Sequence, residues 1–401
     1  MTGPGTTAKA VIAAVIVSMS GAAAAQQCQP EVSFSAWLDS FREEALLSGM
    51  SEPTIRSALG DVGYDPEVVR RDRAQGVFTQ DFLTFAGRMV AQYRLDHGAN
   101  NLARYANTLA RIERTFGVPG PVLASFWGLE TDFGANIGDG STLTSLATLA
   151  YDCRRPDMFY RELISALYLI ERGDLAAAEM RGPWAGELGQ VQFLPSRYVE
   201  YGVDFDGDGR VNMLTSASDA LASAARYLQH LGWRAGEPWL QEVRVTRALP
   251  WEQADVAIKL PLSQWSAWGV TLADGRPLPT IGPDASLLLP MGRNGPAFLT
   301  YPNFDVYLEW NSSLVYSTTA AYFATRLAGA PPVSPGAGVT PLTAAEVREV
   351  QTLLQRRGHD VGDVDGIIGV KTRAAVKAAQ LQFDLPADSY PDAALLARLR
   401  G

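Results

Sequence analysis

The chain has 401 residues, 47% of them hydrophobic and 19% charged, a composition typical of a soluble globular protein with about two or three domains. Its formal net charge of −9 at pH 7 excludes a general nucleic-acid binder, because such a protein needs a basic face. Only three histidines occur, and none lies in a recognisable catalytic pattern, so we expect any acid/base chemistry to use a carboxyl group.

Residues 1–25 have the pattern of a secretion signal. Lys9 supplies a positive charge, and residues 10–18 form an apolar segment that is too short to span a membrane. Residues 23–25 provide small side chains for cleavage before Gln26. We therefore predict an exported, periplasmic protein.

The chain contains two cysteines, Cys28 and Cys153. An even number in an exported protein favours a structural disulfide, which would attach the mature N-terminus to the central domain; two buried thiols are the alternative. Gln26 and Gln27 precede Cys28 where a lipid-attachment site needs small residues, so we do not expect a lipoprotein.

Residues 34–116 are predicted to be mainly helical, with apolar residues at helical spacing over 34–49, 78–93 and 102–116. A loop rich in glycine and proline follows, and Pro121 suits the first turn of a new helix. That helix carries Glu130 near its C-terminal end, with Gly134 as its expected stop. We expect Glu130 at a helix–loop junction, where a side chain can face a cleft.

The second half of the chain mixes helices with short strands. Two more helices are predicted over 159–172 and 217–231. Short apolar strands at 243–246, 287–290 and 298–301 indicate a small β-containing insertion over about 240–310, and a helix at 316–327 returns to the core.

Residues 328–341 contain much proline and glycine and no regular apolar period, which predicts a linker. Residues 342–401 have their own apolar pattern and are expected to form a separate small domain.

The stretch Phe126–Gly134 places one carboxyl group, that of Glu130, inside an apolar run. Apolar surroundings raise the pKa of a carboxyl group, and a carboxylic acid that stays protonated near neutral pH can act as a general acid. The alternative is an exposed helix residue without a catalytic role.

Residues 182–196 are rich in glycine and side-chain amides, with aromatic residues between them. Close backbone approach and amide donors are what a site for amide- and hydroxyl-bearing sugars needs. Gln190 and Gln192 are the candidate substrate contacts, and only one of them would face the ligand if the segment is extended.

A third motif begins at Asp204. Acidic residues at loop positions 1, 3 and 5 and a glycine at position 6 match the start of a helix-loop-helix calcium loop. The twelfth position is Thr215 rather than glutamate, and Asp219 could close the site from the next helix. We expect a structural Ca²⁺ with no part in the chemistry, and a solvated turn is the alternative. The predicted ligands are Asp204, Asp206, Asp208, the carbonyl group of Arg210, and Asp219.

Together these segments resemble the membrane-bound lytic transglycosylase B family (glycoside hydrolase family 103) over roughly residues 34–328. The most specific motifs are 128–134, 145–149, 184–196, 204–219, 295–298 and 303–304. The resemblance implies an α+β, mainly helical fold over residues 26–327, with a lysozyme-like catalytic core and helical and small β subdomains.

The resemblance also implies a reaction. The family cleaves the β-1,4 bond between N-acetylmuramic acid and N-acetylglucosamine in peptidoglycan without water, leaving a 1,6-anhydromuramoyl end and requiring no cofactor. Glu130 matches its single catalytic acid/base and Gln192 its substrate-contacting glutamine. The cleft-lining residues of the family fall at Trp310, Asn311 and Tyr316. The chain departs from the family pattern at Pro183, where serine is usual, and at Trp310, where tyrosine is usual.

The tail resembles the first peptidoglycan-binding domain family. The matching motifs are 350–354, 357–358, 362–366 and 385–388, and Ser389 occupies a position where glycine is usual. This resemblance implies a three-helix module that raises the local enzyme concentration on the cell wall. The alternative is a domain with a structural role only.

The predicted partner is the peptidoglycan glycan strand, with other cell-wall enzymes as possible partners, and we expect a monomer. Two alternative functions stay open at this point: a hydrolytic, lysozyme-like muramidase and a non-catalytic cell-wall-binding scaffold. Asp132, two residues from Glu130, would point elsewhere in a helix, so we do not expect it to act as a nucleophile.

Overall fold

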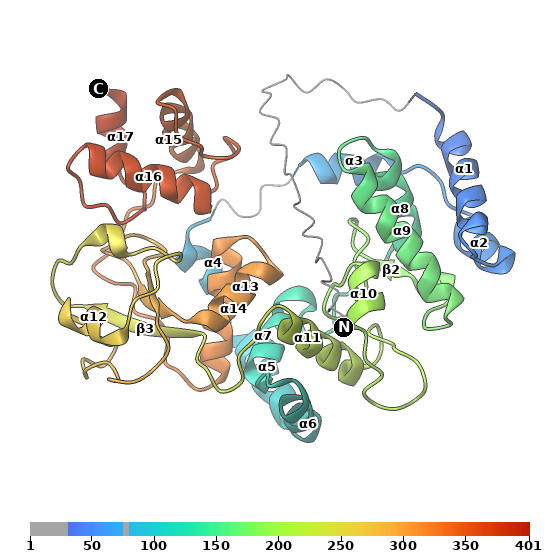
Figure 1. The fold of residues 1–401 in the computed structure, drawn as a ribbon, viewed down its shortest axis with the longest axis horizontal. Helices are drawn as coiled ribbons and strands as arrows, with labels where there is room; N and C mark the ends of the chain where they lie inside the picture. The colour runs from blue at the N-terminus through green and yellow to red at the C-terminus, as the bar shows by residue number, and fades with distance from the viewer. Residues whose placement is uncertain (1–30, 75–79) are drawn as a thin grey trace, which may run out of the picture.

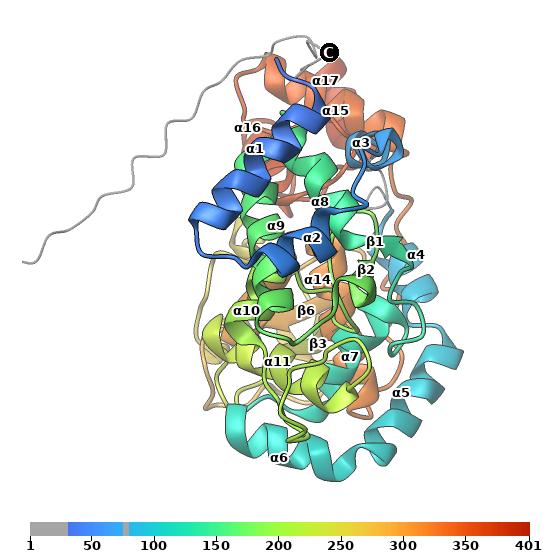
Figure 2. The same cartoon turned by 90° about the vertical axis from the view of Figure 1, so that its right-hand side faces the viewer.

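The computed structural model describes residues 31–74 and 80–401 (Figures 1 and 2). The predicted signal segment 1–25 and Cys28 lie outside these residues, so the cleavage site and the Cys28–Cys153 pairing stay predictions, although Cys153 is not a free thiol. No helix within the described residues is long and apolar enough to cross a membrane. The fold is mainly helical with a small sheet, which confirms the predicted fold class.

The N-terminal helices pack beside two helices from the middle of the chain. Their bounds are α1 Phe34–Leu47, α2 Glu52–Leu59, α3 Pro66–Arg73, α8 Thr142–Tyr151 and α9 Pro156–Glu171. Ser33, Ser51 and Asp65 cap the first three helices, because each side chain accepts a hydrogen bond from a backbone N–H in the first turn. In both views α1 and α2 lie beside α8 and α9 (Figures 1 and 2).

The central helices surround α7, Gly120–Thr131, which carries Glu130. Their bounds are α4 Phe82–Met89, α5 Gln92–Arg104, α6 Ala106–Phe116, α10 Pro195–Tyr201, α11 Ala217–His230, α13 Pro302–Trp310 and α14 Leu314–Leu327. Most residues of α7 are buried, as expected for a helix that is apolar on all sides. Helices α5, α6, α11 and α14 contact it.

Two predicted helix bounds are wrong. The helix predicted over 78–93 ends at Met89, because Val90 leaves the helical region (φ −106°, ψ 40°), and α5 begins after Ala91. Helix α7 ends at Thr131 rather than near Gly134, because Asp132 and Phe133 adopt left-handed φ values of 53° and 61°. Glu130 therefore lies in the last turn, directly before a sharp change of chain direction.

The predicted β-containing insertion forms a four-stranded antiparallel sheet in the order β4-β3-β6-β5. Its bounds are β3 Leu240–Val245, β4 Val270–Leu272, β5 Ser286–Leu288, β6 Ala297–Thr300 and the short helix α12 Leu262–Ala267. Three of the strands correspond to predicted ones, and β4 is additional. Trp265 and the inward residues of the sheet form a separate core. A second ladder pairs β1, Gly140–Ser141, with β2, Arg181–Gly182.

The tail folds into three helices, α15 Ala344–Arg356, α16 Val370–Gln382 and α17 Ala393–Arg400, around their own core. Residues 328–341 contain no helix or strand, as expected of a linker. The module lies against the sheet-containing insertion (Figure 1). Arg293 forms a 2.9 Å ion pair with Asp388, and Arg373 Nη2 donates a 2.8 Å hydrogen bond to the carbonyl oxygen of Leu289.

Candidate active site

The end of α7 is tied to the segment 182–196. Thr131 Oγ1 donates a hydrogen bond to the carbonyl oxygen of Gln190 (2.6 Å) and accepts one from the backbone N–H of Gly134 (3.0 Å). Gly134 has a φ of +84°, and a Cβ atom there would lie 2.6 Å from Gln190 Oε1, so this close approach requires glycine. The sharp turn leaves Glu130 half-buried at the end of the helix.

Two side chains from distant parts of the chain hold one oxygen of the Glu130 carboxyl group. Trp310, at the end of α13, donates a 2.9 Å hydrogen bond from Nε1 to Glu130 Oε1. Tyr316, in the first turn of α14, donates a 2.5 Å hydrogen bond from Oη to the same atom. No hydrogen bond from residues 31–74 or 80–401 reaches Oε2. Oε1 is therefore fixed and Oε2 is available to a ligand.

The surroundings of Glu130 favour its protonated form. Burial raises the pKa of its carboxyl group above the ordinary value, and this is the largest effect. The hydrogen bonds from Tyr316 and Trp310 and the positive charge of Arg197 act in the opposite direction, because each favours the ionised form. The net shift is upward, so the carboxyl group can hold a proton at a pH where an exposed glutamate has lost it. This is the property of a general acid.

The two candidate glutamines have different surroundings. Gln190 is buried: its Oε1 accepts a 2.9 Å hydrogen bond from Trp127 Nε1, and its Nε2 donates to the carbonyl oxygen of Leu214 at 3.2 Å. Both polar atoms of its side-chain amide have partners inside the protein, so the structure does not support the prediction that Gln190 contacts the substrate. Gln192 is half-buried at a φ of 52°, and its Nε2 donates to the carbonyl oxygen of Gly189 at 2.9 Å. Its Oε1 is left for a ligand, and a positive φ at a non-glycine residue is typical of functional sites.

Asn311 forms the turn between the two helices that hold Glu130. Its Oδ1 accepts a 2.9 Å hydrogen bond from the backbone N–H of Ser313, and its carbonyl oxygen accepts a 2.6 Å bond from Ser317 Oγ. These bonds attach the turn to the first residues of α14. Asn311 therefore positions Trp310 and Tyr316, and its side-chain amide nitrogen stays available for the predicted contact with a sugar.

Asp132 is not a second catalytic carboxylate. The sequence analysis placed Asp132 in a helix, which is wrong, because Asp132 ends α7 with a left-handed backbone. Its side chain is nevertheless used elsewhere. Its Oδ1 forms a 3.1 Å ion pair with Arg94, whose guanidinium also donates to the carbonyl oxygen of Met89.

Pro183 lies at one edge of a cavity of about 450 Å³, where it offers no hydrogen-bond donor.

The sequence patterns missed one acidic residue of the site, Glu187. It lies in the same segment as the two glutamines. Burial raises the pKa of its carboxyl group to about 7, and the charge of Glu130 adds a smaller upward effect. The signal for it is an acidic residue among glycines and amides, in a segment that otherwise carries no charge between Trp184 and Ser196.

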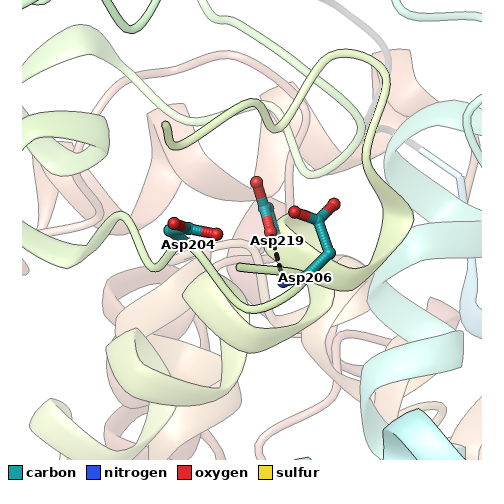
Figure 3. A group of neighbouring side chains, drawn as sticks. All are labelled: Asp204, Asp206 and Asp219. Carbon is teal, nitrogen blue, oxygen red and sulfur yellow. Dashed lines mark hydrogen bonds between the residues drawn. The ribbon is translucent and has the colours of Figure 1, made fainter. Parts of the chain in front are cut away.

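The predicted calcium loop brings three carboxylates together (Figure 3). One oxygen each from Asp204, Asp206 and Asp219 lies within 4.8 Å of the others. Asp219 comes from the first turn of α11 and is fully buried. Its carboxylate oxygens accept hydrogen bonds from backbone N–H groups of the loop. Asp208 is exposed and lies outside the cluster, and its Oδ1 accepts a hydrogen bond from the backbone N–H of Arg210. The prediction that Asp208 belongs to the ligand set is therefore not supported.

Two protein-family models match the sequence of this chain. The family model described as "Transglycosylase SLT domain" matches residues 33–325, and the one described as "Putative peptidoglycan binding domain" matches residues 343–399. The membrane-bound lytic murein transglycosylase B of Escherichia coli K12 is 29% identical over 237 residues. This match covers 59% of the chain and 64% of that relative, slightly less than two thirds of its length.

Solved structures give a closer likeness. SltB3 from Pseudomonas aeruginosa, in complex with NAG-anhNAM-pentapeptide, is 40% identical, with a TM-score of 0.85 over 92% of this chain and all of that one. The same protein in complex with NAG-NAM-pentapeptide matches equally well. The lytic transglycosylase Slt35 of Escherichia coli, in complex with calcium, is 26% identical, with a TM-score of 0.63 over 73% of this chain and 92% of that one.

Proposed function

The chain belongs to the transglycosylase SLT domain family, and on this basis we propose that it is a lytic murein transglycosylase. In this proposal it cleaves the β-1,4 bond between N-acetylmuramic acid and N-acetylglucosamine and leaves a 1,6-anhydromuramoyl end. One observation carries the proposal: the Glu130 carboxyl group has a raised pKa, one oxygen fixed by two donors, and the other oxygen available. Release of soluble muropeptides from purified peptidoglycan tests it.

The first step uses Glu130 as an acid. The protonated carboxyl group donates its proton from Oε2 to the glycosidic oxygen, and the bond from that oxygen to C1 of the muramoyl residue breaks. The positive charge that develops at C1 is stabilised by the N-acetyl group of the substrate itself. Glu130 is then ionised, and the hydrogen bonds from Trp310 and Tyr316 stabilise this form.

The second step uses Glu130 as a base. The ionised carboxylate takes the proton of the muramoyl C6 hydroxyl group, and the C6 oxygen forms a bond to C1. No water is consumed, and Glu130 is protonated again at the end. Because the nucleophile belongs to the substrate, the reaction needs no second carboxylate, unlike ordinary retaining glycosidases.

Replacing Tyr316 by Phe is expected to lower kcat about 10- to 100-fold, because the ionised Glu130 loses a charge-assisted hydrogen bond. The same bond lowers the pKa of Glu130, so its loss should raise that pKa and move the alkaline limb of the activity profile to higher pH. The pH dependence of muropeptide release measures both effects. Tyr168→Phe, at an exposed position of α9, is the matched control. Unchanged kcat in Tyr316→Phe would contradict the assigned role.

The tail and the N-terminus complete the proposal. Residues 343–399 match a peptidoglycan-binding domain, and in this role the module holds the enzyme on the wall and raises its local concentration. The substrate is a component of the cell wall, which supports export to the periplasm through residues 1–25.

We also propose that the loop beginning at Asp204 holds a structural Ca²⁺. Carboxylate oxygens are the ligands that Ca²⁺ prefers, and Asp204, Asp206 and Asp219 present three of them within 4.8 Å of one another. Burial raises the pKa of Asp219, and within residues 31–74 and 80–401 no cationic side chain pairs with it, so a cation fits the donor set. The carbonyl group of Arg210 is the candidate fourth ligand.

Removal of Ca²⁺ by a chelator should lower the thermal midpoint by about 3–8 °C, since a ligand that binds only the folded state stabilises it. Scanning calorimetry with chelator, and again after addition of excess Ca²⁺, measures this effect and its reversal. Equal midpoints under the two conditions would count against a bound ion.

A further inference from the structure

A cavity of about 670 Å³ lies between the catalytic core and the tail module. The core contributes residues at the start of α4, the turn 311–313 and the first residues of α14. The tail contributes residues 341–344, residues 367–369 and Arg373 of α16. Its volume lies in the range of sites that bind small ligands. Both parts of the chain are needed to form this cavity.

Most of the cavity wall is apolar. Phe82 and Leu314 line it from the core, and Ile368 lines it from the tail. Among the described residues of the wall, Arg373 is the only basic one and Asp81 the only acidic one. An apolar cavity with a few charged or polar groups is typical of a site that recognises one kind of ligand.

Arg373 is a buried cation without a carboxylate partner. It is 8% exposed, and its guanidinium forms one hydrogen bond with a described residue, from Nη2 to the carbonyl oxygen of Leu289 at 2.8 Å. The two aspartates whose charges act on it form ion pairs with other cations, in the pairs Asp388–Arg293 and Asp255–Lys377. A guanidinium carries five N–H donors in a fork that matches the two oxygens of a carboxylate. Arg373 therefore provides a site for an anionic group in the wall of the cavity.

The core side of the cavity offers a hydrogen-bond acceptor. Gln80 lines the cavity, and its Oε1 is buried and accepts no hydrogen bond from a described residue. A buried polar atom without a partner is unfavourable, and an N–H group of a ligand would satisfy it. The carboxylate of Asp81 is already used, because its two oxygens accept hydrogen bonds from the backbone N–H (3.0 Å) and Oγ1 (2.6 Å) of Thr84. The unused groups thus suit a ligand that carries both a carboxylate and amide N–H groups.

The cavity adjoins the residues that hold Glu130. Asn311, directly after Trp310, lines the cavity, and so does Leu314 of α14, the helix that also carries Tyr316. Trp310 and Tyr316 donate the hydrogen bonds to Glu130 Oε1. The turn between α13 and α14 therefore supports both the catalytic group and one wall of the cavity. A branch on a sugar that is bound at Glu130 can reach this wall.

We propose that the cavity binds a peptide branch of the peptidoglycan strand, with Arg373 pairing with a carboxylate group of that peptide. The inference rests on the proposed function, which places the glycan strand at Glu130. The apolar wall suits the alkyl side chains of a short peptide, and Arg373 and Gln80 suit its carboxylate and its N–H groups. In this role the tail module forms part of the substrate site, in addition to holding the enzyme on the wall.

The test compares two substrates in the full-length wild type and in Arg373→Gln: glycan strands that carry their peptides, and strands of equal length from which an amidase has removed them. Loss of the pair with the carboxylate is expected to lower the ratio of kcat/KM, peptide-bearing over peptide-free, by about 10-fold. Arg398→Gln is the matched control. It removes an exposed arginine of α17 that does not line the cavity, and it should leave the ratio at the wild-type value.

Conversion of the peptide carboxyl groups to amides separates recognition of the charge from a structural effect. This conversion should lower kcat/KM of the wild type for the peptide-bearing strands by about 10-fold and that of Arg373→Gln by much less. Arg373→Lys keeps the positive charge but not the fork, so it should retain part of the preference. An equal effect of the conversion on wild type and Arg373→Gln would indicate a structural role only and would overturn the inference.

Ser312→Trp provides a second test if Arg373→Gln does not fold, as judged by its thermal midpoint. Ser312 is exposed in the turn on the core side, and an indole ring there would fill part of the cavity, so the same ratio should fall. Ratios equal to that of the wild type in both variants would contradict the inference. Wild-type protein that releases no product from either substrate would refute the proposed function itself, whereas active wild-type protein with unchanged ratios in the variants refutes this inference alone.

Discussion

Replacement of Glu130 by Gln is expected to lower muropeptide release from purified peptidoglycan by roughly 10²- to 10⁴-fold, the usual contribution of a positioned general acid/base. Glutamine keeps the shape of the side chain and an oxygen that can accept the hydrogen bonds from Trp310 and Tyr316. It has no acidic proton for the leaving oxygen and no basic oxygen for the C6 hydroxyl group. Both steps of the proposed reaction are therefore lost together.

The matched control is Glu309→Gln. Glu309 is exposed on α13, next to Trp310, so Glu309→Gln makes the same side-chain substitution close to the site without touching the Glu130 carboxyl group. The variant Glu130→Gln should still sediment with peptidoglycan, since the C-terminal module is unchanged. Undiminished lysis by Glu130→Gln would refute the assignment of the catalytic residue.

Replacement of Asp219 by Ala is expected to have the largest effect on stability, about 3–5 kcal/mol of the free energy of unfolding. Its Oδ1 accepts hydrogen bonds from the backbone N–H groups of Phe205 (2.9 Å) and Asp206 (3.3 Å), and its Oδ2 accepts one from that of Asn212 (2.9 Å). The substitution leaves these donors without their partner and opens a cavity at a fully buried position.

Urea denaturation in the presence of chelator isolates this hydrogen-bond contribution from that of any bound ion. Asp208→Ala is the control in the same loop, where an exposed side chain outside the carboxylate cluster should cost less than about 1 kcal/mol. Repeating both measurements with Ca²⁺ should widen the gap between the two variants if Asp219 is a ligand. Equal stability of the two variants in chelator would contradict the role of Asp219 as the organiser of the loop.

Glu130 could be predicted from sequence because its signal is local: one carboxyl group near the end of an apolar helical run. Its partners lie 180 and 186 residues away along the chain, so no local pattern reveals that Trp310 and Tyr316 reach the same oxygen. The resemblance to a family supplied their identity, and the structure adds the geometry.

The predictions that the structure does not support also failed because of contacts between residues that are distant in sequence. Gln190 and Gln192 differ by two positions in sequence, but the left-handed backbone at Gln192 and the indole N–H of Trp127 decide which amide is used inside the protein. The early end of α7 depends on tertiary contacts, since Thr131 donates a hydrogen bond to the carbonyl oxygen of Gln190 and Asp132 forms an ion pair with Arg94. Helix periodicity carries no information about such contacts.

The central claim is that the substrate's own C6 hydroxyl group replaces water as the nucleophile, with Glu130 serving as acid and then as base. Mass spectrometry of muropeptides released by the purified protein in ¹⁸O-labelled water tests it most directly. The account predicts 1,6-anhydromuramoyl ends, lighter by one water than the corresponding reducing ends, with no ¹⁸O incorporated. Reducing muramic acid ends that carry ¹⁸O would contradict it and identify a hydrolytic muramidase.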